Sequence, residues 1–225
     1  MPRWLPLESN PDVVNAFLHP LGLPQQYNVV DVFGFDPEML AFVPRPVLAV
    51  FLLFPYTDAD EAAAPAQDAH PADSLFFMKQ RPGIGNACGT IAALHALGNT
   101  QDKIHYAPDS YFARLFARQR SMTPEQRGDD LIADQELAGQ HHEAAAQGQT
   151  ECPHEDASVD LHFIAFACVN GTLYEFDGLK ASPIPHGHTT PESLLEDAVA
   201  LVKGTFMARS PDDPRFNVMA LSAEN

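Results

Sequence analysis

The sequence predicts a mixed α/β protein of the α+β kind, with a mostly antiparallel central sheet flanked by helices. Apolar, β-branched and aromatic runs alternate along the chain with segments that carry helix-start signals. Asn170-Gly171 between two such runs is typical of a tight hairpin, which joins antiparallel strands. The 225 residues, 45% of them hydrophobic, are enough to bury a large core. We find no repeat and no change of composition, so a single domain over residues 1–225 is expected.

Helix starts are marked by capping residues followed by proline or an acidic side chain. Asn10-Pro11-Asp12 opens a helix over 11–18 with one apolar face, and Thr123 to Gln126 has the pattern of a capping box. The other predicted starts are at Asp36, Asp109 and Thr190, and a further helix follows Cys88.

Strands are predicted over six runs: 28–33, 47–54, 74–79, 159–168, 172–177 and 215–221. The run 47–54 is apolar at every position, which indicates a strand buried on both faces and is too short to span a bilayer. Two segments, 57–73 and 139–158, hold few large apolar side chains, so we expect mobile loops there.

The composition excludes several classes of function. A formal net charge of −17 without a basic stripe argues against nucleic acid as a partner. The charge fits either a solvated surface or a partner that presents positive charge. Three cysteines indicate a reducing compartment, and no signal peptide is evident, so a cytoplasmic location, or also a nuclear one, is expected. We expect no membrane association, and a monomer, because no large apolar helix face demands a partner.

The predicted hairpin places a histidine beside a carboxylate. If Asn170-Gly171 forms the loop, the register sets Ile164 opposite Asp177. His162 is two residues from Ile164, so its side chain points from the same face of the hairpin as that of Asp177. The two residues are diagonal neighbours, which are spaced about 7–8 Å apart across a strand pair, within reach of long side chains.

Cys88 adds a nucleophile at the start of an expected helix. In this arrangement His162 takes the thiol proton and Asp177 holds the imidazole tautomer. The orphan N–H groups of a helix N-terminus favour thiolate and can stabilise an oxyanion. Taken singly, each residue also fits a structural role, as a packed thiol, a core histidine and a turn residue. The combination indicates a cysteine hydrolase.

Four further residues have side chains of the kind that bind metals: His141, His142, Cys152 and His154. Their spacing matches no standard zinc motif, and a structureless loop cannot preorganise ligands. We therefore expect no metal site and no cofactor.

Several blocks of the sequence resemble the ubiquitin C-terminal hydrolases, a family of papain-like cysteine proteases. The main blocks are "NACGTIAALHALGN", "VDLHFIAFACVNGTLYEFDGLKASPIPHG" and "RFNVMALSA". The resemblance extends over nearly the whole chain and is weakest across 57–73 and 139–158. It implies a papain-like fold with a knotted backbone. It also implies cleavage of small or flexible adducts after the C-terminal glycine of ubiquitin, through a thioester acyl-enzyme.

The same resemblance assigns roles to individual residues. Cys88 corresponds to the nucleophile, His162 to the general base and then acid, and Asp177 to the group that orients it. Gln80, together with the Cys88 N–H, corresponds to the oxyanion hole. The segment 139–158 corresponds to a crossover loop above the cleft. Carboxylates that meet the arginines of the ubiquitin tail correspond to Glu8, Asp12, Asp31 and Asp213.

One part of the pattern departs from the family. Gln80 stands eight residues before Cys88, a longer spacing than the family has, with "RPGIG" between them. We predict that the extra residues bow outward and that Gln80 keeps its place, since loop insertions cost little. The alternative is that the longer loop displaces the side-chain amide of Gln80 from the oxyanion hole. Two other functions stay open: a ubiquitin-binding module of low activity, and a hydrolase of a ubiquitin-like modifier.

Overall fold

A computed structural model describes residues 4–57, 60, 75–82, 84–148 and 160–223. Its centre is a six-stranded sheet in the order β1-β6-β2-β3-β4-β5, in which every neighbouring pair is antiparallel. The strands are β1 Tyr27–Asp31, β2 Val47–Pro55, β3 Leu161–Val169, β4 Thr172–Phe176, β5 Ile184–His188 and β6 Asn217–Ala223. The predicted antiparallel sheet is confirmed, and the implied knot stays a prediction.

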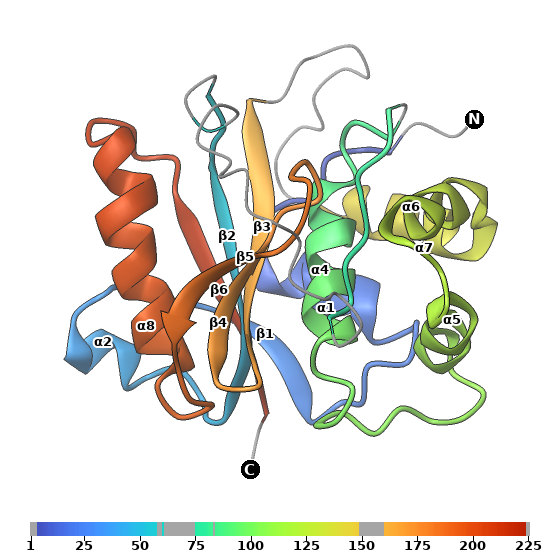
Figure 1. Ribbon diagram of the computed structural model, residues 1–225, viewed down its shortest axis with the longest axis horizontal. Helices are drawn as coiled ribbons and strands as arrows, with labels where there is room; N and C mark the ends of the chain where they lie inside the picture. Colours follow the sequence, from blue (N-terminus) through green and yellow to red (C-terminus); the bar gives the residue numbers. More distant parts are fainter. Residues whose placement is uncertain (1–3, 58–59, 61–74, 83, 149–159, 224–225) are drawn as a thin grey trace.

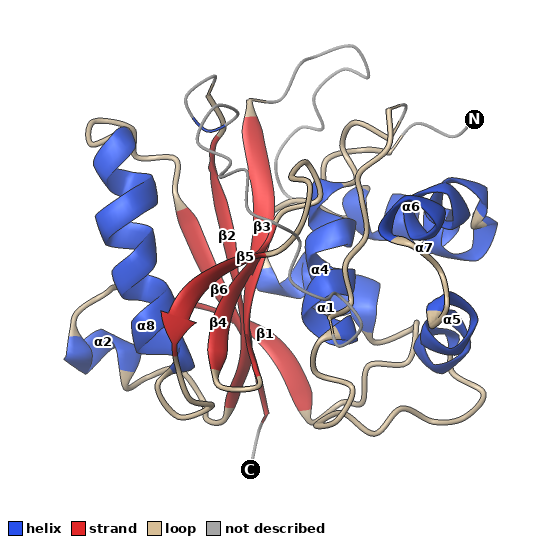
Figure 2. Cartoon of the chain, viewed as in Figure 1, coloured by secondary structure: helices blue, strands red, loops and turns tan. Residues whose placement is uncertain are grey.

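Helices cover both faces of this sheet, with α2 and α8 on one side and the remaining α-helices on the other (Figures 1 and 2). The helices are α1 Pro11–Leu18, α2 Pro37–Leu40, α4 Cys88–Gly98, α5 Tyr111–Gln119, α6 Pro124–Ala133, α7 Gln135–Ala145 and α8 Leu194–Leu201, followed by the π-helix η2 Val202–Met207. Among the described residues, no helix is long and apolar enough to cross a membrane.

Strand β2 lies between two apolar cores, as its uninterrupted apolar sequence predicts. Ala49 and Phe51 belong to the core beneath α4, whereas Val50 and Leu52 belong to the core beneath α8. Helix α4 is buried from its second residue to its last, which explains why its sequence is apolar all round rather than amphipathic. The sheet and α4 thus form the rigid centre of the protein.

The local start signals of α1 and α6 are confirmed. Asn10 accepts the N–H of Asp12 at 3.0 Å, and Thr123 and Gln126 form both bonds of a capping box, at 2.8 and 3.3 Å. These caps satisfy N–H groups that a helix start leaves without partners.

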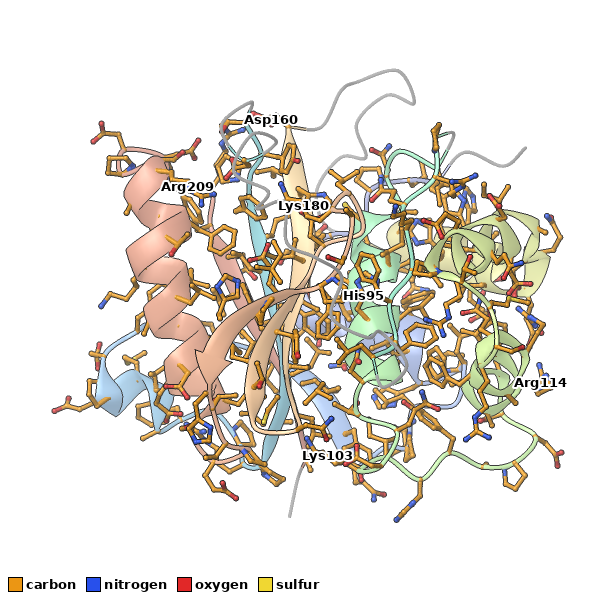
Figure 3. The ribbon with its side chains drawn as sticks, in the orientation of Figure 1. His95, Lys103, Arg114, Asp160, Lys180 and Arg209 are labelled. Carbon is orange, nitrogen blue, oxygen red and sulfur yellow. The ribbon has the colours of Figure 1, made fainter. Side chains whose placement is uncertain are left out.

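The predicted strand 74–79 is wrong over its described residues, because side chains on α4 and at its C-cap take the place of a neighbouring strand. The side chain of Asn99 accepts the N–H of Phe76 at 2.9 Å and donates to its carbonyl at 2.7 Å. The N–H of Met78 lies 3.0 Å from Nε2 of His95, which lies on α4 (Figure 3). The buried backbone is satisfied without a ladder.

The predicted loop 139–158 is wrong at its start, because residues up to Ala145 belong to α7. Asp134 caps this helix through the N–H of Leu137, at 3.0 Å. Leu137, His141 and Ala145 are buried, so tertiary packing supplies what the Ala-rich sequence lacks in large apolar side chains. Most of the expected loops, 58–59, 61–73 and 149–158, lie outside the described residues.

Two helix starts differ from the prediction by a few residues. Ser110, rather than Asp109, caps α5 by accepting the N–H of Ala113 at 3.3 Å. Helix α8 begins at Leu194, because Thr190 and the following residues form a turn closed by its own side chains.

Strand β5 was not predicted, because its sequence, "IPHGH", contains proline and glycine, which are uncommon in strands. Both residues are tolerated here because β5 lies at an edge of the sheet.

Candidate active site

Cys88 is the first residue of α4 and is half-buried. Ala87 before it offers no side-chain cap, and the first turn contains no acidic residue. The N–H groups of this turn therefore keep their partial positive charge. This charge is placed to favour a thiolate at Cys88 and to stabilise the oxyanion that forms on a carbonyl oxygen when the sulfur attacks it.

Gly89 allows the first turn of α4 to lie close to two other elements. A Cβ at this position would lie 3.1 Å from Cβ of Leu7 and 3.3 Å from Cδ2 of Phe163. The close approach places Cys88 next to β3, the strand that carries His162.

His162 and Asp177 meet as the hairpin arithmetic predicts. Asn170-Gly171 forms the tight loop, with φ angles of 51° and 77°, and Ala165 pairs with Phe176 in the predicted register. Nε2 of His162 lies 2.7 Å from Oδ1 of Asp177, and both side chains are buried. Since Asp177 takes Nε2, Nδ1 is the nitrogen left for the hydrogen bond with Cys88.

The charges of this group support one another. Burial alone would lower the pKa of His162, but the hydrogen bonds and charges of Asp177 and Cys88 outweigh it and raise that pKa well above its ordinary value. Burial alone would raise the pKa of Asp177, but His162 and the N–H of Leu179, at 2.9 Å, lower it. The pair is therefore an imidazolium and a carboxylate.

Two aromatic rings hold the imidazole in place. The ring of Phe54 lies 6.0 Å from that of His162 and the ring of Tyr56 lies 5.1 Å from it, both in edge-on geometry. Sequence reasoning missed both residues, because their contact depends on the pairing of β2 with β3. No local signal in the sequence reveals that pairing.

Gln80 lies between the two halves of the site. Its N–H donates to the carbonyl of Gly178, next to Asp177, at 2.8 Å. Its side-chain Nε2 donates to the carbonyl of Gly85 at 2.9 Å and lies 3.4 Å from that of Ile84. Its Oε1 is buried and has no partner. The longer loop therefore folds back onto the Gln80 amide.

The four carboxylates expected to meet ubiquitin have different surroundings. Asp12 is exposed in the first turn of α1. Glu8 accepts a bond from Asn10 at 3.3 Å. Asp31 ends β1, and its Oδ1 is buried without a hydrogen-bond partner.

The carboxylate of Asp213 already forms an ion pair with an arginine. Arg215 donates to both of its oxygens, the shortest distance being 2.8 Å, and lowers the pKa of Asp213. Arg215 also pairs with Asp160 at 2.8 Å. A second arginine at Asp213 must therefore compete with this pair.

Of the four residues considered as metal ligands, the structure describes His141 and His142. His141 is buried inside the helical layer and His142 is exposed, while Cys152 and His154 lie outside the described residues. In the part of the chain that the structure describes, no three His, Cys, Asp or Glu side chains form a group suited to a metal.

A thiol at a helix N-terminus, beside a histidine that a buried aspartate orients, defines a cysteine-type hydrolase. Residues 4–208 match the family described as ubiquitin carboxyl-terminal hydrolase, family 1. The chain belongs to this family.

Curated relatives agree with this assignment. The ubiquitin carboxyl-terminal hydrolase of Aplysia californica is 44% identical over 212 residues, which cover 93% of this chain and 97% of that protein. Ubiquitin carboxyl-terminal hydrolase 3 of Arabidopsis thaliana is 44% identical over 226 residues, covering 98% of this chain and 94% of that protein. The human isozyme L1 is 35% identical over 223 residues, covering 96% of each chain.

A solved structure shows the same fold. The Trichinella spiralis UCH37 catalytic domain, bound to ubiquitin vinyl methyl ester, superposes with a TM-score of 0.78 at 21% identity. The match covers 99% of this chain and 97% of that one. The predicted α/β fold class is confirmed.

Proposed function

We propose that this protein is a thiol-dependent deubiquitinating hydrolase that cleaves the bond after the C-terminal glycine of ubiquitin. One observation carries the assignment to this chain: Asp177 binds His162 at 2.7 Å, and His162 in turn meets Cys88 at the start of α4. The chain's membership of the ubiquitin carboxyl-terminal hydrolase family supplies the substrate.

The reaction proceeds by two acyl transfers. The Cys88 sulfur attacks the carbonyl carbon of the terminal glycine, and His162 gives its proton to the departing amine. The C–N bond breaks and a thioester forms. A water then loses a proton to His162 and attacks the thioester, which releases the ubiquitin carboxylate and a proton and restores the Cys88 thiolate beside the His162 imidazolium. Asp177 keeps Nδ1 of His162 directed at sulfur throughout.

The oxyanion of each tetrahedral intermediate lies at the start of α4. The backbone N–H of Cys88 is one donor and the side-chain amide of Gln80 is the second. The position of Gln80, tied to Gly178 at one end and to the loop before Cys88 at the other, supports this role.

Ubiquitin binds through the arginines of its tail to carboxylates of this protein. The net charge of −17 favours such a partner. Glu8, Asp12, Asp31 and Asp213 supply the carboxylates. Among the described residues no ion pair involves Asp31, whereas Arg215 already pairs with Asp213.

The remaining assignments follow from the family and the composition. The 225 residues form one catalytic domain that acts as a monomer in the cytoplasm, and also in the nucleus. Small or flexible adducts are the leaving groups that the family resemblance implies, and residues 149–158 of the segment that corresponds to its crossover loop lie outside the described residues.

A second candidate is a ubiquitin-binding module of low activity. The engagement of the Gln80 amide by Gly85 favours it, because a donor held by the protein is withdrawn from the oxyanion. A ubiquitin-like modifier is the alternative substrate for the same chemistry.

The deciding experiment measures release of a fluorogenic amine from the C-terminus of ubiquitin. We expect turnover by the wild type, none by Cys88→Ala, and ubiquitin binding by both. Folded wild type that binds ubiquitin without turnover would establish the binding module. Faster turnover of a ubiquitin-like substrate assayed in parallel would reassign the substrate.

A further inference from the structure

His141 has both ring nitrogens hydrogen-bonded inside the protein. Nδ1 lies 2.7 Å from Oγ1 of Thr90, and Nε2 lies 2.7 Å from the carbonyl of Leu5. A carbonyl only accepts, so Nε2 carries the proton and Nδ1 accepts the hydroxyl proton of Thr90. The imidazole is therefore neutral, with a single tautomer.

The surroundings of His141 keep it in that state. It is 1% exposed, and the rings of Trp4 and Phe17 lie 4.6 and 5.9 Å from its own in edge-on geometry. Burial lowers its pKa to about 4, against the opposing hydrogen bond to Leu5. A neutral histidine so enclosed is a fixed structural link at physiological pH.

The three elements that His141 joins all lead to the proposed site. Thr90 is in the first turn of α4, two residues after Cys88. Leu5 belongs to the N-terminal segment that continues to Glu8. His141 itself is on α7, and the chain just after that helix lies against Glu8, because a Cβ at Gly148 would lie 2.6 Å from Oε2 of Glu8.

Apart from its close packing against Leu7 and Phe163, the first turn of α4 has few side-chain contacts of its own to fix it. Ala87 provides no capping side chain, and Gly89 carries no side chain at all. A threonine hydroxyl inside a helix ordinarily bonds to the carbonyl one turn earlier. The hydroxyl of Thr90 is directed out of the helix to His141 instead.

We propose that His141 is a positioning residue for acyl transfer: through Thr90 it fixes the first turn of α4, so that the sulfur and N–H of Cys88 stay aligned with His162. It ties this turn to the segment that carries Glu8. The inference rests on the proposed hydrolase function.

The test removes the hydroxyl of Thr90 without changing its shape. Thr90→Val should lower kcat by about tenfold and leave KM nearly unchanged, since small displacements of reacting groups cost one to two orders of magnitude. Thr90→Ser keeps the hydroxyl and should retain most of kcat. His141→Gln should lower kcat similarly, and the double variant should lose no more than the larger single loss.

Thr100→Val is the matched control. Thr100 lies just beyond the other end of α4, is fully buried, and donates to the carbonyl of Ala96 at 2.9 Å. This variant undergoes the same chemical change just beyond the same helix and should destabilise the protein without lowering kcat.

The rate at which iodoacetamide alkylates Cys88 is a second measurement. A loss of stability alone does not change the pH dependence of this rate. Thr90→Val should shift the pH dependence of this reaction, because the alignment of sulfur with His162 changes, whereas Thr100→Val should not. The inference is overturned if Thr90→Val keeps kcat within twofold of wild type, if both valine variants lose kcat equally, or if the alkylation profile stays unchanged. An inactive wild type would overturn the proposed function instead.

Discussion

The side-chain amide of Gln80 donates to the carbonyl of Gly85 at 2.9 Å, so the segment before Cys88 folds back onto the residue at its own start. An amide nitrogen has two hydrogens. The second faces the carbonyl of Ile84 only at 3.4 Å, near the limit of a hydrogen bond. One hydrogen can thus be held by Gly85 while the other turns toward an oxyanion. If the side-chain amide of Gln80 were rotated by half a turn, its oxygen Oε1 would face the two carbonyl oxygens of Ile84 and Gly85. Because two oxygens repel each other, the orientation with Nε2 toward these carbonyls is the favoured one.

Gln80→Ala should therefore lower kcat by about 10²-fold or more with little change in KM, because a donor to the oxyanion acts in the transition state. Steady-state kinetics with fluorogenic ubiquitin measures both constants. Gln101→Ala is the control, since Gln101 also donates to a backbone carbonyl, that of Gly98 at 2.8 Å, away from the thiol. Turnover by Gln80→Ala within a few-fold of wild type would remove Gln80 from the oxyanion hole.

Asp177→Asn should lower kcat by about 10²–10⁴-fold, because the amide no longer selects the imidazole tautomer or stabilises its charge. The pKa of His162 should fall toward its ordinary value, which proton NMR of the ring can follow. Glu175→Gln alters a second carboxylate–imidazole pair, with His186 at 2.7 Å, and serves as the control. An unchanged His162 titration in Asp177→Asn would contradict the role of Asp177.

The sequence alone was enough to predict the position and register of the hairpin, because Asn170-Gly171 forms its loop and so sets which residues pair on either side. Helix caps are equally local, and the predicted caps at Asn10 and Thr123 are confirmed. In both cases the partners lie within a few residues of each other, or within one hairpin. Such features need no knowledge of the tertiary fold.

Long-range contacts were beyond prediction. Segment 74–79 has the composition of a strand, yet its backbone is hydrogen-bonded to side chains on or just beyond α4. The pattern of apolar residues in a sequence does not reveal such contacts. His141 looked like part of a loop, and its partners lie 51 and 136 residues away along the chain. The approach of Cys88 to His162 followed from chemistry and family resemblance, since no spacing in the sequence measures it.

The buried histidines should make the protein lose stability in mild acid. Burial lowers the pKa of His95 to about 4, against its hydrogen bond with Met78. The unfolded chain binds this proton near its ordinary pKa of 6.5, so between pH 6.5 and 4 it holds more protons than the folded state. The free energy of unfolding therefore falls as the pH is lowered across this window.

Urea unfolding of wild type and His95→Gln from pH 7 to pH 4 tests this contribution. The variant is less stable at pH 7, and the difference from wild type should shrink as the pH falls. His141→Gln should behave in the same way, because burial lowers the pKa of His141 to about 4 as well. A difference that stays constant over the window would show that His95 titrates equally in both states.

The carboxylates expected to bind ubiquitin should differ in importance. The Oδ1 of Asp31 is buried without a partner, whereas Asp213 is already paired with Arg215 at 2.8 Å. No ion pair within the described residues competes for the carboxylate of Asp31, whereas at Asp213 a cation from ubiquitin must displace Arg215. In a Cys88→Ala background, Asp31→Asn should therefore weaken ubiquitin binding about tenfold or more, since hydrogen bonds to charged groups are the stronger ones. Asp213→Asn should change the Kd much less.

Calorimetric titration with ubiquitin at two salt concentrations separates charge from shape in this comparison. Added salt should weaken the parent protein more than Asp31→Asn, because the variant has lost a charge that salt screens. Asp12→Asn, an exposed acid in the first turn of α1, measures the general effect of removing one negative charge. Equal effects of all three asparagine variants would mean that ubiquitin responds to the overall negative charge of the protein and makes no specific contact with Asp31.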